Sequence, residues 1–177
     1  ANTTGYTNVG VGVSAMYANT TGANNTALGF RALQNNTTGN SNIAIGKDAL
    51  LGASTASNNV AIGYDSMEDN TTGERNVSVG NYSSEELTTG VDNVAVGYQA
   101  LETSTIGSKN VAIGRLALQA NTTASENTAV GSDALASNTT GYRNTGIGCS
   151  ALAANTTAGS NTAVGWHAGM NITTGGS

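Results

Sequence analysis

The sequence predicts an all-β protein folded as one parallel β-solenoid, and three observations lead to this prediction. A pentapeptide of the type NVAIG, found at residues 59–63, recurs ten times. The 177-residue chain has 24 glycines and is only 10% charged, unlike the highly charged sequences of disordered chains. The copies are spaced by 17 residues without insertions, which is typical of a solenoid whose coils bury apolar side chains only against their neighbours. The closing glycine of the pentapeptide falls at Gly12, Gly29, Gly46, Gly63, Gly80, Gly97, Gly114, Gly131, Gly148 and Gly165.

Each coil runs from one NTTG-like segment to the next, and residues 1–177 form a single repeat domain. Neighbouring strands of a sheet lie about 4.8 Å apart, so ten stacked coils should form a rod about 48 Å long. Both ends keep the phase of an interior coil, so we expect neighbouring segments or end-to-end copies to cover them. The coils are residues 2–18, 19–35, 36–52, 53–69, 70–86, 87–103, 104–120, 121–137, 138–154 and 155–171, with a partial coil at 172–177.

The pentapeptide alternates in the way that a short β-strand does. Its second and fourth positions, Val60 and Ile62 in one copy, are β-branched or aliphatic and share one strand face. We expect this face to form a continuous aliphatic core, and the closing glycine to begin a turn. A second apolar pair, such as Ala117-Leu118, follows after two variable residues and should close the core from the opposite side.

The third position of the pentapeptide is always small and never charged. A strand position that faces solvent would vary more widely, so we expect this column to pack against a second chain that leaves no room for larger side chains. The candidate subunit interface is Ala27, Ala44, Ala61, Ser78, Ala95, Ala112, Ala129 and Ala163.

Two polar columns repeat in strict phase, namely the asparagine that opens each pentapeptide and the first threonine of the NTTG segments. Identical side chains stacked coil over coil can hydrogen-bond to one another, and we interpret both columns as structural ladders. The ladders include Asn25, Asn42, Asn59, Asn76, Asn93, Asn110, Thr20, Thr37, Thr71 and Thr122.

All charged and aromatic residues fall in the three variable pairs of each coil, which we therefore place at outward corners. Exposed aromatic rings beside polar groups suit stacking on sugars or contact with a receptor, although such rings can also simply cover the backbone ladder. The corner after the glycine gives a candidate ligand or receptor surface: Phe30, Arg31, Tyr64, Asp65, Tyr82, Tyr98, Gln99, Trp166 and His167.

The chain offers little for catalysis. Cys149 is the only cysteine and His167 the only histidine, and the repeat brings them to neighbouring coils. An imidazole can stabilise a thiolate, but both residues lie at variable corners and nothing supplies an oxyanion hole. We therefore predict no enzyme, no catalytic residue and no cofactor.

The distribution of charge excludes some partners. The net charge is −5 and the six basic residues are scattered singly, so we expect no binding to nucleic acid. No apolar run is long enough for membrane insertion. The acidic pairs Glu68-Asp69 and Glu85-Glu86 share a corner of neighbouring coils, and we interpret them as a solvated patch in preference to a site for a hard cation.

The motifs NVAIG, NVAVG and NTAVG, each followed by xxAL, resemble the repeats of trimeric autotransporter adhesin heads, which are left-handed parallel β-rolls assembled as homotrimers. They are also similar to the NTALG…AL…NTTG repeats of phage and large-virus tail fibres that end in an intramolecular chaperone domain. The resemblance covers the whole chain, although the coil here is longer than the adhesin-head repeat. It implies a left-handed homotrimer with the small column at the trimer interface.

These observations predict an extracellular, non-enzymatic fibre segment on a virion or cell surface, either a viral tail fibre or a bacterial adhesin. Its partners would be further copies of itself and a cell-surface glycan or receptor. One alternative is an ice-binding β-solenoid, although the pattern gives at most one outward threonine column where a regular two-column array is expected. Another alternative is the subunit of a self-assembling extracellular filament.

Overall fold

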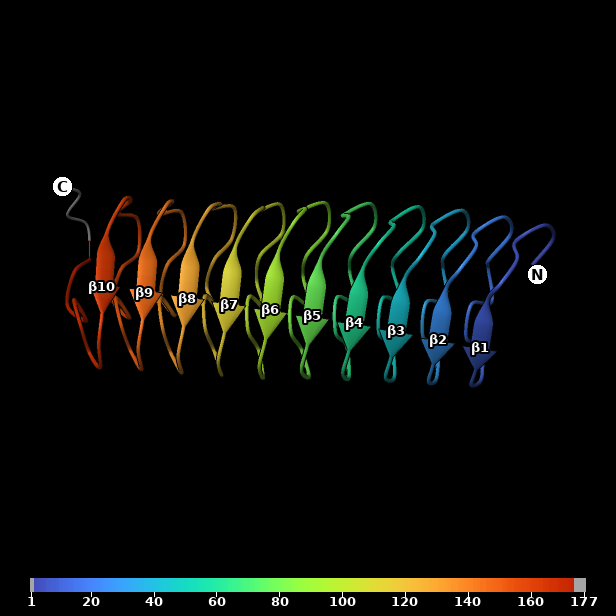
Figure 1. Cartoon of the computed structure of the whole chain (residues 1–177), viewed down its shortest axis with the longest axis horizontal. Helices are drawn as coiled ribbons and strands as arrows, with labels where there is room; N and C mark the ends of the chain where they lie inside the picture. Colours follow the sequence, from blue (N-terminus) through green and yellow to red (C-terminus); the bar gives the residue numbers. More distant parts are fainter. Residues whose placement is uncertain (1, 174–177) are drawn as a thin grey trace.

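The computed structural model describes residues 2–173, which contain only strands, turns and bends (Figure 1). Ten strands pair in chain order as one parallel sheet. Since the described residues include no helix, none of them could cross a membrane as a helix. The predicted all-β parallel solenoid is confirmed. The strands are β1 Val9–Val11, β2 Thr26–Leu28, β3 Ile43–Ile45, β4 Val60–Ile62, β5 Val77–Val79, β6 Val94–Val96, β7 Val111–Ile113, β8 Thr128–Val130, β9 Thr145–Ile147 and β10 Thr162–Val164.

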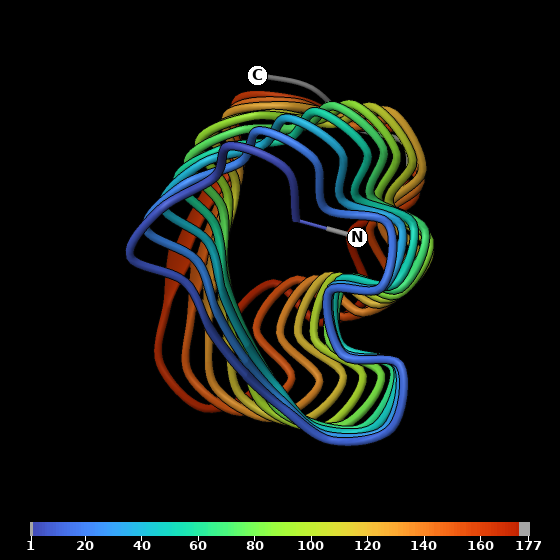
Figure 2. The same ribbon diagram turned by 90° about the vertical axis from the view of Figure 1, so that its right-hand side faces the viewer.

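The register between coils follows the 17-residue period of the sequence. Val60 of β4 pairs with Val77 of β5, and the same step holds along the sheet. Backbone hydrogen bonds also join the turns of neighbouring coils, as from Met67 N–H to the Ser83 carbonyl at 3.0 Å. Seen from the N-terminal end in Figure 2, the chain runs counterclockwise as the coils recede, so the solenoid is left-handed.

The sheet is oriented in the opposite way to our prediction: the second and fourth positions of the pentapeptide face outward, and the third position faces the interior. Ile113, at the fourth position of its pentapeptide, is 39% exposed, and Val60 and Ile62 of β4 are also partly exposed. The predicted aliphatic core is therefore wrong. The predicted subunit interface is wrong for the same reason, because the third-position residues are buried inside their own chain: Ala27, Ala44, Ala61, Ser78, Ala95, Ala112, Ala129 and Ala163.

The third position is small because the interior of the coil has no more room. A Cβ atom built on Gly146, the third-position residue of β9, would lie 3.3 Å from Leu135 Cγ and 3.1 Å from the Ala151 carbonyl oxygen. The leucines of the second apolar pair already fill the space opposite the sheet. The size limit is therefore imposed by the chain itself and requires no partner.

The second apolar pair lies in the core opposite the sheet, as predicted, and supplies most of its larger side chains. Ala117 and Leu118 both have no exposed surface. The largest fully buried apolar side chains are Leu33, Leu50, Met67, Leu87, Leu101, Leu118, Leu135 and Leu152.

Serines interrupt this core at the middle of the rod. One apolar cluster extends to Met67 and Leu87, and a second begins at Ala95. Between them, Ser78 Oγ lies 3.0 Å from Ser66 Oγ and 2.7 Å from Ser83 Oγ, and all three side chains are buried. Hydrogen bonds thus replace apolar contacts at this level of the solenoid.

The glycine that closes each pentapeptide is required by its backbone. Gly63 has a φ of +143°, which residues with a side chain rarely adopt. A Cβ atom there would collide with the carbonyl group of Gly80 in the next coil. The same conflict recurs at the closing glycines from Gly12 to Gly148, and Gly165 shares the positive φ, which explains why this column does not vary.

Both polar ladders are present in the structure. The Asn59 amide is buried, and its Nδ2 donates to the Gly73 carbonyl at 2.8 Å while its Oδ1 accepts from the Asn76 backbone N–H at 2.9 Å. The threonine ladder joins side chain to backbone, as from Thr20 Oγ1 to the Thr37 carbonyl at 2.9 Å. These columns therefore satisfy backbone groups that the three-residue strands leave open.

Candidate functional sites

The structure brings together three of the predicted aromatic residues in the middle of the rod. The ring centroids of Tyr64 and Tyr82 are 5.2 Å apart, and those of Tyr82 and Tyr98 are 5.9 Å apart, both in edge-to-face arrangements. We call these three residues the tyrosine ladder. Tyr82 joins it although it lies one position later in its coil than Tyr64, whose position is taken by Asn81. The Asn81 side chain instead accepts a hydrogen bond from Tyr64 N–H at 3.0 Å.

Four of the other predicted surface residues, Phe30, Arg31, Trp166 and His167, lie toward the two ends of the rod. Phe30 is 44% exposed, and the Arg31 guanidinium carbon lies over its ring, 5.2 Å from the ring centroid. Trp166, in the last complete coil, is 75% exposed and stacks on His167 with a centroid separation of 3.7 Å. The predicted surface is thus three separate patches and not one continuous site.

Two of the predicted polar surface residues are engaged or buried. Gln99 donates from Nε2 to Glu102 Oε1 at 2.6 Å. Asp65 is only 8% exposed, so its place on a contact surface was predicted wrongly. This carboxylate lies against those of Glu68 and Glu85 instead.

The outward side of the sheet is an apolar strip along the whole rod, which we call the sheet face. It consists of the second and fourth positions of the pentapeptides and contains no charged residue. Sequence reasoning missed it because these positions had been assigned to the core. Its members are Val9, Val11, Thr26, Leu28, Ile43, Ile45, Val60, Ile62, Val77, Val79, Val94, Val96, Val111, Ile113, Thr128, Val130, Thr145, Ile147, Thr162 and Val164.

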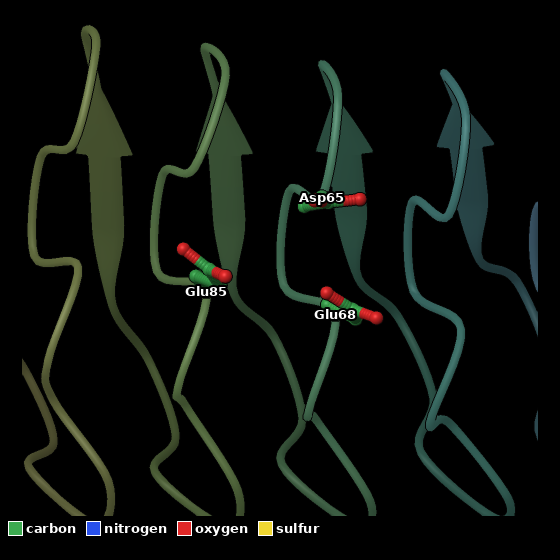
Figure 3. A group of neighbouring side chains, drawn as sticks. All are labelled: Asp65, Glu68 and Glu85. Atoms are coloured by element: carbon green, nitrogen blue, oxygen red, sulfur yellow. The ribbon is translucent and has the colours of Figure 1, made fainter.

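Three carboxylates meet beside the tyrosine ladder. Figure 3 shows these three side chains on two neighbouring coils. Asp65, Glu68 and Glu85 each offer an oxygen, and these oxygens all lie within 4.8 Å of one another. We call these residues the acid cluster. Burial raises the pKa of all three carboxyls, and the neighbouring acidic groups add to the effect on Glu68 and Glu85. The pKa of Glu85 rises from 4.5 to about 7, with Glu102 as its strongest charged neighbour.

This pKa shift predicts a decline in stability as the pH rises. Folded Glu85 holds its proton more tightly than the unfolded chain, so its contribution is complete below pH 4.5 and is lost as the pH rises through about 7. In chelator-treated buffer, the Glu85→Gln variant should lose much of this decline in urea denaturation, whereas exposed Glu86→Gln should keep it. Equal pH profiles for wild type and Glu85→Gln would contradict this assignment.

The candidate catalytic pair does not form a recognisable centre. Cys149 is exposed, and its Sγ lies 3.8 Å from Ser150 Oγ, while the His167 ring stacks on Trp166. No pocket is found in the part of the chain that the structure describes. The notable features of residues 2–173 are therefore surfaces and one carboxylate cluster.

No protein-family model, curated protein or solved structure matches this chain. Function must therefore be inferred from the sheet face, the corners and the acid cluster.

Proposed function

We propose that this protein is a non-enzymatic segment of an extracellular adhesive fibre, in which copies of the chain associate through their sheet faces. The observation that supports this proposal is the sheet face itself, an apolar strip that continues over all ten strands. Leu28 is 47% exposed and Val164 is 67% exposed on this strip. Soluble proteins rarely leave such long apolar surfaces in water unless another surface covers them.

A second and third copy of the chain are the covering partners that we favour. Every coil presents the same pair of outward positions, so identical rods can pack in register along their full length. Closed cyclic symmetry is the usual arrangement of identical subunits, and a homotrimer agrees with the resemblance of the repeats to those of trimeric adhesins. The interface would then be the aliphatic columns, in place of the small column that we first predicted.

Association through the sheet face leaves the corners free to contact a receptor. The tyrosine ladder and the Trp166 patch present aromatic surface, the kind of side chain that stacks on sugar rings. On this proposal, the asparagine and threonine ladders supply a stiff scaffold, and the variable corners recognise a cell-surface glycan or receptor. The fibre would belong to a virion or a bacterial cell surface.

The positions of the threonines favour this proposal over ice binding. Within the sheet face, threonine occupies only Thr26, Thr128, Thr145 and Thr162. In the NTTG segments, the first threonine uses its hydroxyl as a donor to the next coil, as Thr37 does to the Ser54 carbonyl at 2.8 Å. A regular two-column hydroxyl array is therefore not formed, and we expect no thermal hysteresis from the wild-type protein.

The proposed association can be tested with the double variant Ile45→Glu/Val79→Glu. Both side chains lie on the sheet face and are partly exposed, so the coil should fold while the apolar contact between copies is broken. We expect light scattering to give about three chain masses for the wild type and one for the variant, with unchanged circular dichroism.

The matched control is Thr72→Glu/Thr89→Glu, which adds the same charge at exposed threonines of the NTTG-like segments. This control should keep the mass of the wild type. A wild-type mass of a single chain at all concentrations would contradict association through the sheet face.

A further inference from the structure

We propose that Asp65, Glu68 and Glu85 bind one hard divalent cation of the size of Ca²⁺, which joins the coils 53–69 and 70–86. This site does not depend on the proposed fibre function. Carboxylate oxygens are the ligands that Ca²⁺ prefers, and the described chain places no histidine or cysteine in the cluster to select a softer metal.

The geometry of the acid cluster suits a cation of this size. Calcium lies about 2.4 Å from its oxygen ligands, so two oxygens on one ion are separated by at most about 4.8 Å. The oxygens of Asp65, Glu68 and Glu85 all lie within 4.8 Å of one another, so small side-chain movements would bring all three onto one ion. Glu68 and Glu85 are only partly buried, so water can complete the coordination.

Asp65 provides a second observation in favour of a bound cation, because its carboxylate is buried and lacks a full set of hydrogen-bond partners. It is 8% exposed, and its Oδ1 is buried without any hydrogen bond. A buried carboxylate oxygen without a partner is costly in free energy. A cation bound within the cluster would satisfy it.

The corresponding aspartate one coil earlier shows how the chain normally neutralises this position. Asp48 is buried and accepts two hydrogen bonds from the Arg31 guanidinium, both at 2.7 Å. Lys47 Nζ lies 2.8 Å from its second oxygen. Asp65 has no cationic side chain of this kind within salt-bridge distance among the described residues.

Glu85 can be compared in the same way with the corresponding glutamate one coil later. Glu102 follows Glu85 by one repeat, and amide groups satisfy both of its oxygens: Gln99 Nε2 donates at 2.6 Å and Gln119 Nε2 at 2.7 Å. Within residues 2–173, the carboxylates of Glu68 and Glu85 form no salt bridge. The acid cluster is thus a place where stacked acidic groups have no salt-bridge partner, since Arg31 and Lys47 pair with Asp48 and attract Asp65 only at longer range.

The position of the cluster suggests what the cation contributes. Ser66, Ser78 and Ser83 interrupt the apolar core in these same coils. A cation that links Glu68 of one coil to Glu85 of the next would hold the solenoid together at this level. We therefore expect Ca²⁺ to stabilise the rod as well as to bind to it.

Calorimetric titration of the chelator-treated 177-residue chain with CaCl₂ in 150 mM NaCl tests the proposal. We expect one Ca²⁺ per chain and a rise in the thermal unfolding midpoint on addition of Ca²⁺. The Glu68→Gln/Glu85→Gln variant should bind at least tenfold more weakly and should show no such rise.

The control is Asp69→Asn/Glu86→Gln, which removes the same charge from the exposed neighbours of the cluster. This control should bind as the wild type does. An absence of binding by the wild type at millimolar Ca²⁺ would overturn the proposal. An equal loss of affinity in both double variants would overturn it too, since it would indicate a diffuse acidic surface and not a built site.

Discussion

Replacement of Leu118 by alanine is expected to lower the free energy of unfolding by about 2–5 kcal/mol. Leu118 has no exposed surface and belongs to the second apolar cluster of the core. Its removal loses apolar burial and leaves a cavity that the ladders of the neighbouring coils prevent from closing. Chemical denaturation followed by circular dichroism measures the change.

The matched comparison is Ile113→Ala, on the outward side of the adjacent strand. Ile113 is 39% exposed, so we expect a loss of less than about 1 kcal/mol in a single chain. The comparison should be made in the Ile45→Glu/Val79→Glu background, because contact between copies would add to the effect of Ile113. A larger loss for Ile113→Ala than for Leu118→Ala in that background would mean that the orientation of the sheet described above is wrong.

The orientation of the sheet is the part of the fold that could not be predicted from alternation. Alternation shows that Val60 and Ile62 share a face and that Ala61 lies on the other, but it is silent on which face is inside. Aliphatic side chains were assigned to the interior on hydrophobicity alone. The deciding fact is steric: the leucine column already fills a narrow coil, and only a small residue fits opposite to it.

The period, the strands and the polar ladders were more predictable because they depend on register alone. A step of 17 residues without insertion places every asparagine above the next, and hydrogen bonds such as that from Asn76 N–H to Asn59 Oδ1 follow from this. The uniformly small third column, including Gly146 and Ser78, was the available signal for the tight interior. We attributed it to a partner chain.

Only two of the three residues of the acid cluster could be identified from the sequence. The repeat places Glu68 and Glu85 at the same position of adjacent coils, and this pair was identified. The third member was not, because Asp65 belongs to a different turn and was assigned to the surface. Its backbone has a φ of 52°, and this left-handed turn conformation is not determined by spacing. Asp69, which sequence reasoning grouped with Glu68, is exposed instead.

Replacement of one asparagine of the ladder by aspartate is expected to lower the free energy of unfolding as much as the loss of a core leucine. Asn110 is fully buried, and its Nδ2 donates to the Ala124 carbonyl at 2.9 Å. Asn110→Asp keeps the shape but removes this donor and places a negative charge beside the Ala124 oxygen. At pH 7 we expect a loss of about 3–5 kcal/mol, as for other buried charges without a partner.

The pH dependence of Asn110→Asp separates this electrostatic cost from simple misfolding. Burial raises the pKa of such a carboxyl above its unfolded value of about 3.9, so its proton is held more tightly in the folded chain. The variant should therefore approach wild-type stability near pH 3.5, where the protonated acid donates again to the Ala124 carbonyl, and lose it as the pH rises through the folded pKa. Asn58→Asp, at an exposed corner, should change the urea midpoint little at either pH. An equal deficit of Asn110→Asp at pH 3.5 and pH 7 would show that the ladder depends on something other than its hydrogen-bond donors.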